Sequence, residues 1–309
     1  MVSLIKCFFS FFLSLICYGA YHRGENDRDN ACGDNISIIS PEGIVNEDVL
    51  RILEILELNN SRDPSEVNRI MQENLLRKTE RSEVIKKSYS EEKNMQLFQC
   101  FDNLRMRETV LPKNRNYDDI IIHGSTVVAM IKRMTFFLEK CAPFIIYKRI
   151  ILLSGDRALS VDEKNNEIIC KISEKKNIKI STEAEAAKEI WCYLTNEKQP
   201  LQEMILISAP ATIDSNGNKK RPTTYDTIVE WLRIKPDSKT CLAISSNPYI
   251  DYQHAVVKNT LDEKKESIYL ETIGAHSKEM RPEIYLDSLA RWFYEEYKLY
   301  KKNNQKKGS

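Results

Sequence analysis

Beyond Pro112 the chain alternates short runs of β-branched and apolar residues with longer segments of helical periodicity. Such alternation is typical of a parallel sheet joined by crossover helices, because a tight turn cannot link parallel neighbours. The apolar runs are short and nearly continuous, as strands buried on both faces require. They predict five strands, at Asp119–His123, Arg149–Ser154, Glu203–Ser208, Thr240–Ser245 and Ser267–Ile273.

Amphipathic segments lie between or after these runs, with apolar residues recurring three and four positions apart. They predict helices at about Val127–Lys140, Thr182–Leu194, Tyr225–Arg233, Tyr249–Leu261 and Ile284–Lys302. The polar stretch 158–181 contains the short apolar runs Ile168–Ile172 and Ile178–Ile180, which predict a small β-hairpin insertion. We therefore expect an open, mostly parallel α/β domain over residues 113–303, followed by a polar tail at residues 304–309.

Residues 41–112 predict an N-terminal helical region in front of this domain. Amphipathic segments begin near Asn46, Pro64 and Glu91, and Pro64 with Asp63 before it is a typical helix start. Three helices of this length make only a marginal core by themselves. We expect them to pack on the α/β domain or to cap its pocket.

The first twenty residues differ sharply from the rest, because Lys6 precedes the apolar run Cys7–Cys17. The run is short for a membrane span but fits the apolar part of a signal peptide, and an uncleaved anchor is the alternative. This predicts an exported protein, periplasmic or anchored in the inner membrane of a bacterial envelope. A buried helix of a cytoplasmic protein is the other interpretation. Residues 21–40 are polar and predict an exposed linker.

Composition excludes several function classes. With 46 basic and 45 acidic residues the net charge is +1, so no global field attracts polyanions and no nucleic-acid partner is predicted. No Walker A or GxGxxG pattern occurs. The six cysteines beyond the leader form no CxxC pair and lie apart from the histidines, so no metal site is predicted. Most are interpreted as buried thiols, with one or two disulfides as the alternative for an exported chain.

Small polar residues follow the predicted strands, where ligands bind in open parallel sheets. The candidate ligand-binding residues at these ends are Gly124, Ser125, Ser154, Gly155, Asp156, Arg157, Ser245, Ser246 and Asn247. Helix N-termini after such loops offer amide groups and a partial positive charge that suit a phosphate or carboxylate. Arg133, Arg157 and Arg221 carry forked donors for the same small anion.

Acid, base or hydroxyl-accepting roles fall to an acidic set and one histidine. Asp156, Glu183 and Asp226 are the carboxylate candidates, and His123 at a strand end is a better candidate than His254 within a helix. The alternative for Ser, Thr and Asp residues at helix starts is an ordinary helix cap, and for Asp156 it is an exposed ion pair with Arg157. Whether the protein is an enzyme is therefore left open.

Five segments occur in an order that resembles the YdcF/SanA/ElyC-like family over about residues 117–275. They are Asp118–Ser125, Arg149–Gly155, Thr182–Ala186, Thr223–Thr227 and Ile244–Ser246. The resemblance implies a Rossmann-like three-layer sandwich, frequent association with the envelope, and binding of a nucleotide-like cofactor such as S-adenosylmethionine. The residues that match the family's pattern are Gly124, Ser154, Gly155, Glu183 and Thr224, with Arg133 where the family's first-helix arginine is expected.

The chain also departs from this pattern. Thr223–Thr227 lacks both amide side chains of the family's Asn-Thr-x-Glu-Asn-like stretch, and Asn247–His254 keeps only one shifted imidazole of a His and Arg pair. Two hypotheses stay open. One is an envelope-associated protein that binds a phosphorylated or nucleotide-like small molecule; the other is a non-catalytic interaction or scaffold protein with residues 41–112 as its partner surface. A membrane partner is predicted only if the leader stays uncleaved.

Overall fold

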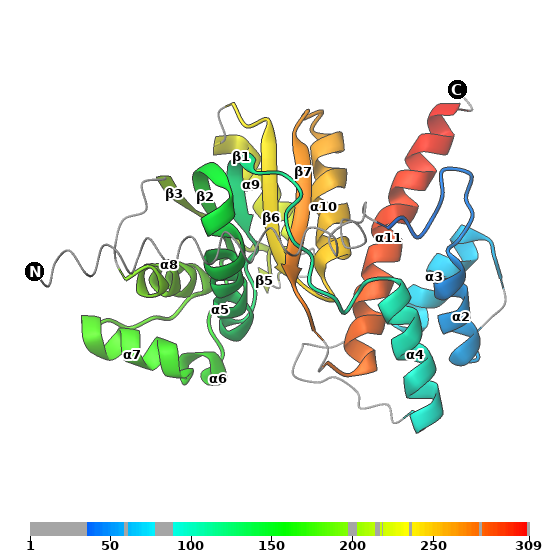
Figure 1. Cartoon of the computed structure of the whole chain (residues 1–309), viewed down its shortest axis with the longest axis horizontal. Helices are drawn as coiled ribbons and strands as arrows, with labels where there is room; N and C mark the ends of the chain where they lie inside the picture. Colours follow the sequence, from blue (N-terminus) through cyan, green and yellow to red (C-terminus); the bar gives the residue numbers. More distant parts are fainter. Residues whose placement is uncertain are drawn as a thin grey trace, which may run out of the picture. The chain divides into compact units, whose positions relative to one another are not determined.

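The computed structural model describes residues 36–58, 61–77, 89–196, 203–213, 217, 219–234, 237–277 and 280–307 (Figure 1). Residues Ser37–Ser309 form one compact unit. The predicted leader at residues 1–20 and most of the predicted linker at residues 21–40 lie outside the described residues.

Within the described residues, one sheet of five strands has the order β3-β2-β1-β6-β7, and every pair of neighbours is parallel. The strands are β1 (Asn116–Ile122), β2 (Ile146–Gly155), β3 (Glu203–Ala209), β6 (Thr240–Ser246) and β7 (Tyr269–Ala275). Each overlaps a strand predicted from the sequence. Helices pack on both faces, so the predicted Rossmann-like three-layer α/β sandwich is confirmed.

Successive residues of the strands bury their side chains on opposite faces of the sheet. Ile120 and Ile122 of β1 belong to one buried cluster, which also contains residues of α5 and α8. Ile121 between them belongs to a second cluster with Trp231 of α9 and Val257 of α10. Because both faces are apolar, each needs its own layer of helices, and this explains the unbroken apolar runs in the sequence.

The two helical layers follow from these clusters. The first face is covered by α5 (Val127–Phe136), which continues as a π-helical turn (Phe137–Cys141), by α7 (Glu167–Lys176) and by α8 (Glu183–Leu194). The second face is covered by α9 (Thr224–Ile234) and α10 (Ile250–Glu263). A two-stranded antiparallel ribbon of β4 (Thr212–Ile213) and β5 (Lys219–Lys220) precedes α9.

The long helix α11 (Pro282–Lys307) joins the α/β domain to the N-terminal helices, as Figure 1 shows. It packs against α10 on one side and against α3 and α4 on the other, while α2 packs on α4. These three helices are α2 (Glu47–Ile55), α3 (Pro64–Asn74) and α4 (Glu91–Asn103). At the contact, the Phe101 ring of α4 stacks on the Tyr285 ring of α11 with centroids 4.9 Å apart. Of the N-terminal helices, α3 and α4 therefore pack against α11, and α2 packs against α4.

Residues 158–181 form two helices instead of the predicted β-hairpin, namely α6 (Val161–Lys164) and α7 (Glu167–Lys176). The hairpin prediction was wrong because the buried residues of the first run, Ile169 and Ile172, recur at a helical spacing. The Asn166 side chain caps the start of α7, and Asn177 ends it in the left-handed region with a φ of 51°. The caps and the period agree on a helix.

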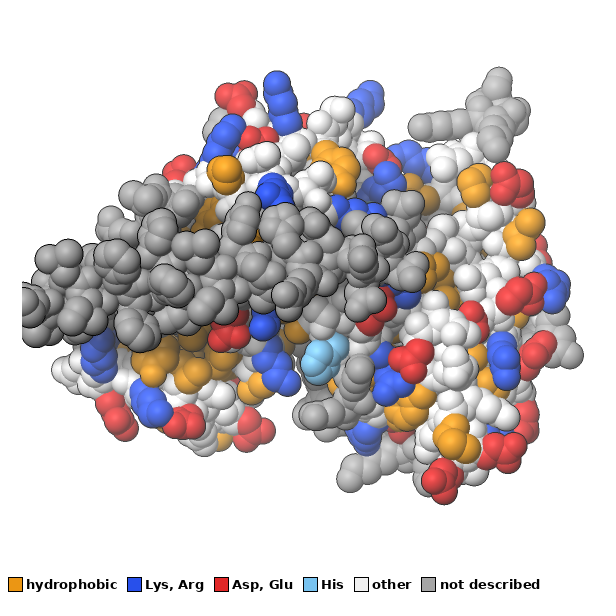
Figure 2. All heavy atoms as spheres, in the orientation of Figure 1, with side chains coloured by type: hydrophobic (Ala, Val, Ile, Leu, Met, Phe, Trp, Pro, Cys, Tyr) orange, Lys and Arg blue, Asp and Glu red, His pale blue; other side chains and the backbone are white. Residues whose placement is uncertain are grey.

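The described part of the chain carries free thiols and a surface with charges of both signs (Figure 2). Within the described residues Cys100, Cys141, Cys170, Cys192 and Cys241 are free cysteines. No helix in the described ranges is long and apolar enough to span a bilayer. Figure 2 shows Lys and Arg side chains interspersed with Asp and Glu side chains over the described part of one face.

Candidate functional site

A pocket lies where the chain changes direction across the sheet. From β1 the chain continues to β2 and β3 on one side, whereas β6 and β7 lie on the other side of β1. In open α/β sheets the connections leave such a point in opposite directions and open a crevice at the carboxyl ends of the strands. The pocket here has a volume of about 540 Å³, within the usual range for small-molecule sites.

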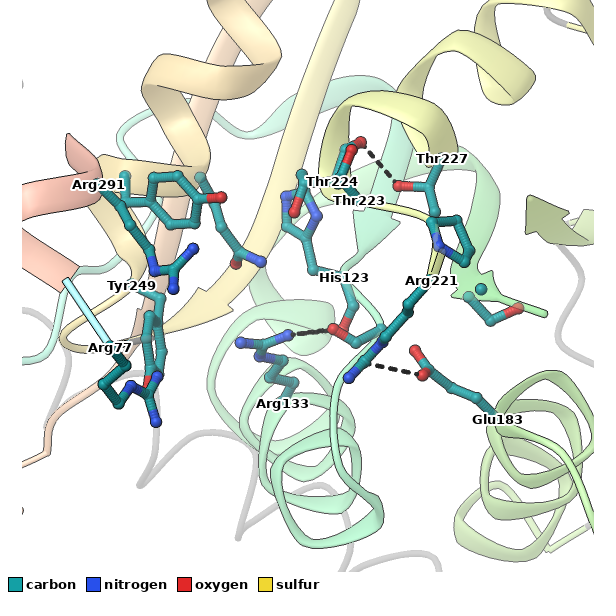
Figure 3. Close-up of a pocket in the computed structure, with 16 residues that line it drawn as sticks. Arg77, His123, Arg133, Glu183, Arg221, Thr223, Thr224, Thr227, Tyr249 and Arg291 are labelled. Carbon is teal, nitrogen blue, oxygen red and sulfur yellow. Dashed lines mark hydrogen bonds and ion pairs between the residues drawn. The ribbon is translucent and has the colours of Figure 1, made fainter. Parts of the chain in front are cut away.

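The pocket draws on strand-end loops, on the helices α5, α8, α9, α10 and α11, and on the segment after α3 (Figure 3). Its lining residues are Arg77, His123, Gly124, Arg133, Ser154, Gly155, Glu183, Arg221, Pro222, Thr223, Thr224, Thr227, Tyr249, Tyr252, Gln253 and Arg291. Among them are four arginines and one carboxylate, that of Glu183. The lining is therefore strongly basic in a protein whose total charge is close to zero.

Arg133 of α5 is almost completely buried and fixes the turn after β1. Its Nη1 donates to the carbonyl oxygens of His123 at 2.8 Å and of Gly124 at 2.9 Å, and its Nε donates to Ser246 Oγ at 3.4 Å. The guanidinium group thus ties the end of β1 to the end of β6. These bonds give Arg133 a positioning role as well as a positive charge at the pocket.

His123 is an uncharged group at neutral pH. Burial lowers the pKa of its imidazole to about 3, with a further contribution from the positive charge of Arg133. Its Nε2 is buried and has no hydrogen-bond partner among the described residues. An imidazole in this state is a neutral donor or acceptor beside the pocket, and it is a poor base because its pKa is so low.

Two glycines are required because other segments of the same chain approach them closely. A Cβ on Gly124 would collide with the Glu183 carboxylate and with the carbonyl oxygen of Leu153. A Cβ on Gly155 would lie 2.6 Å from Pro222 Cγ. Since backbone and ring atoms cannot move aside cheaply, these positions keep the strand-end loops open for a ligand.

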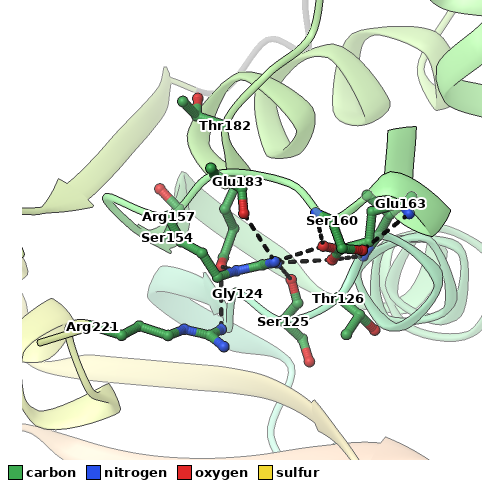
Figure 4. Close-up of polar contacts among 12 residues, drawn as sticks. Gly124, Ser125, Thr126, Ser154, Arg157, Ser160, Glu163, Thr182, Glu183 and Arg221 are labelled. Carbon is green, nitrogen blue, oxygen red and sulfur yellow. Dashed lines mark hydrogen bonds and ion pairs between the residues drawn. The ribbon is translucent and has the colours of Figure 1, made fainter. Parts of the chain in front are cut away.

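Arg157 is the centre of a buried ionic network rather than a lining residue (Figure 4). Its Nε donates to Glu183 Oε2 at 2.6 Å, its Nη1 and Nη2 donate to the Glu163 carboxylate at 2.6 and 2.8 Å, and Nη2 also reaches the carbonyl oxygen of Ser125 at 3.1 Å. Burial would raise the pKa of Glu163, but the ion pair with Arg157 and the hydrogen bonds from the Ser160 and Val127 amides together outweigh it and lower the pKa to about 2. The network fixes the positions of all three side chains.

Glu163 also holds the start of α5. Its Oε1 accepts from the backbone amide of Val127 at 3.2 Å, and its Oε2 accepts from that of Ser160 at 2.9 Å. Glu183, the first residue of α8, accepts a second ion pair from Arg221 at 3.3 Å. Glu183 thus contributes a carboxylate that two arginines already neutralise.

A second ionic group, Arg77–Asp287–Arg291, lies at the other side of the pocket. Asp287 of α11 has no exposed surface. Its carboxylate accepts from Arg77 Nη2 at 2.6 Å, from the Arg77 backbone amide at 3.0 Å, and from Arg291 Nε and Nη2 at 3.2 Å each. Burial alone would raise the pKa of Asp287, but these bonds hold it below its usual value.

The structure brings part of the predicted site together. Of the candidates, the pocket is lined by His123, Gly124, Arg133, Ser154, Gly155, Glu183, Arg221 and Thr224. The candidates outside its lining are Ser125, Asp156, Arg157, Asp226, Ser245, Ser246 and Asn247. The sequence-based list and the pocket lining therefore share residues at the carboxyl edge of the sheet, but several candidates lie outside the lining.

Several outlying candidates have local structural contacts. Asp226 Oδ2 accepts from the Thr223 amide and hydroxyl at 2.7 Å each, which is a helix cap. Ser245 Oγ donates to Gln253 Oε1, and Asn247 Nδ2 donates to the carbonyl oxygens of Arg105 and Glu108. Even Ser154, which lines the pocket, donates its hydroxyl to the Ile207 carbonyl oxygen at 2.7 Å.

Arg77 and Arg291 were missed by reasoning from the sequence. Arg77 follows α3, and Arg291 lies in the middle of α11, so neither is near a strand end in the sequence. The spacing of Asp287 and Arg291 predicts an ordinary pair one helical turn apart. No local pattern connects this pair with Arg77, which lies 210 positions away from Asp287 along the chain.

No protein-family model matches the sequence, and no curated protein matches it significantly. The fold and the pocket themselves define the class: a Rossmann-like α/β protein with a basic pocket at the carboxyl edge of its sheet.

Proposed function

We propose that this is an envelope-associated α/β protein that binds a phosphorylated or nucleotide-like small molecule in the strand-end pocket, with no reaction assigned. The observation that carries the proposal is the charge of the lining, which has four arginines and a single carboxylate. Planar guanidinium groups present paired donors that match phosphate oxygens. Their attraction for an anion is stronger in a partly buried pocket than on an open surface.

The start of α9 supports an anionic ligand. Thr223 and Thr224, both in the lining, are the last residue before this helix and its first residue. The positive end of the α9 dipole therefore lies at the pocket, beside Arg221. A phosphate placed there gains from the dipole and from one guanidinium group together.

The same charges favour a phosphorylated ligand over S-adenosylmethionine. That cofactor carries a positively charged sulfonium group and a single carboxylate. Glu183 is the carboxylate of the lining, and Arg157 and Arg221 already pair with it. A sulfonium group would meet mainly positive charge, whereas a nucleotide phosphate would meet complementary charge.

The test is binding of defined probes to the purified chain, measured by thermal shift and by titration calorimetry. We expect saturable stabilisation by inorganic phosphate, pyrophosphate and nucleoside phosphates, and weaker stabilisation by S-adenosylmethionine. Arg221→Gln should weaken phosphate binding about tenfold or more, because it removes a charge-assisted hydrogen bond.

Arg233→Gln is the matched control. Arg233 lies near the end of α9, the helix that Arg221 precedes. It pairs with Glu230 and has an exposed side chain. The Arg233→Gln substitution removes one positive charge without changing the pocket, so phosphate affinity should stay within about twofold of the parent. If no phosphate probe binds the parent chain, the ligand-binding proposal fails and the interaction or scaffold function takes its place.

The envelope location is proposed from the apolar run Cys7–Cys17 behind Lys6. Expression of the full chain in a bacterium, followed by fractionation and N-terminal sequencing, tests it. A periplasmic or membrane-bound product supports export, and a product confined to the cytosol with an intact N-terminus contradicts it.

A further inference from the structure

Three of the four lining arginines fall into two sets on different elements. Figure 3 shows Arg221 and Glu183 on one side and Arg77, Tyr249 and Arg291 on the other. The first set comes from the start of α8 and the segment before α9, and the second from the segment after α3, the residue before α10, and α11. A single phosphate fills only a small part of a 540 Å³ pocket, so it leaves one set unoccupied.

Asp287 cannot neutralise both arginines of the second set. Its two oxygens accept four hydrogen bonds, one from the Arg77 amide and three from the guanidinium groups, so its acceptor positions are filled. Two guanidinium charges share one carboxylate charge. One positive charge therefore remains at this side of the pocket without a counter-charge from Asp287.

This remaining charge is only partly solvated. The Arg77 side chain is 14% exposed and the Arg291 side chain 35% exposed. Arg77 Nε is buried and has no hydrogen-bond partner among the described residues. The bonds to Asp287 use Arg77 Nη2 and Arg291 Nε and Nη2, so the two Nη1 groups are not engaged by this carboxylate. A like-charged pair that is partly desolvated is best completed by an anion.

We propose that Arg77 and Arg291 form a second anionic subsite, and that the ligand of this pocket carries two separate anionic groups, as a bisphosphate does. The proposal rests on the proposed function, because it assigns the second group of the same phosphorylated ligand. One group binds beside Arg221 and the start of α9. The other binds beside Arg77 and Arg291, and Asp287 positions both of these guanidinium groups.

The middle of the pocket fits the uncharged part of such a ligand. Figure 3 shows His123 and Arg133 between the two sides. Two hydrogen bonds of Arg133 go to backbone carbonyl oxygens, and His123 is neutral. Tyr249, Tyr252 and Gln253 of the α10 segment complete the wall. Hydroxyl or ring groups between the two phosphates would meet aromatic and neutral polar side chains there.

The test uses a series of alkanediol bisphosphates of increasing length, each compared with the alkyl monophosphate of the same length, in calorimetric titrations of the full chain. We expect one chain length to bind at least tenfold tighter than its monophosphate, because both phosphates then bind within one molecule. Equal affinities at every length would overturn the second subsite while leaving phosphate binding intact. Absence of binding by both series would overturn the proposed function as well.

Variants then assign the subsite. Arg77→Gln and Arg291→Gln should each weaken the best bisphosphate by a larger factor than its monophosphate, because the second phosphate loses its partner. Arg221→Gln should weaken both probes. The matched control is Arg69→Gln on α3, an exposed arginine that pairs only with Glu66 and Glu73 among the described residues, and it should change neither affinity. An equal loss of affinity for both probes in Arg77→Gln would contradict two separate subsites. The length series uses the parent chain, so its result does not depend on whether a variant folds.

Discussion

Asp251, in the first turn of α10, is a carboxyl group held in an unfavourable environment. Burial and the nearby Glu296 carboxylate together raise its pKa to about 7, against the opposing charge of Arg105. Burial also raises the pKa of Glu296, although its carboxylate accepts hydrogen bonds from the Ile38 and Ile39 amides. The two acids therefore oppose each other where the chain enters the compact unit.

This raised pKa predicts how stability depends on pH. Between the usual value of 3.8 and about 7, the folded protein holds a proton on Asp251 that the unfolded chain has lost. The folded state binds more protons there, so this contribution to the free energy of unfolding falls as pH rises through that window. We expect Asp251→Asn to raise the free energy of unfolding by on the order of 2 kcal/mol at pH 8, with a smaller gain at pH 5.

Urea denaturation at the two pH values measures the effect. Asp262→Asn on the same helix is the control, because Asp262 is exposed and its replacement should change stability by less than about 0.5 kcal/mol at either pH. An equal gain for Asp251→Asn at pH 5 and pH 8 would rule out titration of this carboxyl as the cause.

At the scale of elements, Arg157 connects three parts of the fold. It follows β2, binds Glu163 of α6 and Glu183 of α8, and reaches the carbonyl oxygen of Ser125 before α5. The carboxylate side chains are only 9% and 4% exposed. Such a buried pair is costly to break because the remaining charges stay inside the protein.

Arg157→Gln should therefore lower the free energy of unfolding by about 3 kcal/mol, measured by guanidinium chloride denaturation. The expected reason is that Glu163 loses its guanidinium partner and Glu183 keeps only the longer contact with Arg221. Arg69→Gln, which breaks exposed pairs on α3, should cost no more than about 0.5 kcal/mol. A loss below 1 kcal/mol for Arg157→Gln would mean that water replaces the network at little cost.

The sequence predicted elements better than contacts. The strands were predictable because unbroken apolar runs occur where a sheet is covered on both faces, and the strand ends indicated Gly124 and Ser154, which line the pocket. The helices of segment 158–181 were not predicted, because short isoleucine-rich runs fit either a strand or a helix until the helix caps are considered. Arg77 was not predictable at all, since its place beside Arg291 depends on how α3 packs against α11.

At the scale of the whole molecule, positive and negative charges nearly cancel, but their distribution is uneven. The net charge is +1, and Figure 2 shows both signs over the described part of one face. The pocket lining departs from this balance with its four arginines. Local attraction at the pocket therefore occurs without a long-range field around the protein.

This difference predicts separate responses to salt. Raising sodium chloride from 50 to 500 mM should weaken phosphate binding roughly threefold or more, because mobile ions screen the arginines that a ligand approaches. The midpoint of urea denaturation should change little, since the balanced surface gains and loses comparable interactions. Calorimetric titration and denaturation at the same salt concentrations measure both. Phosphate affinity independent of salt would contradict a charge-dominated pocket.

Because Arg77 contacts Asp287, the two sides of the pocket are built by different parts of the chain and can evolve independently. One side is built by loops of the sheet, and the other by a residue after α3 together with α11. Substitutions in the N-terminal helices can therefore alter what is recognised at one end while the sheet continues to hold the other. Related chains that share this sheet but carry different N-terminal helices would be expected to share half of a ligand and to differ in the rest.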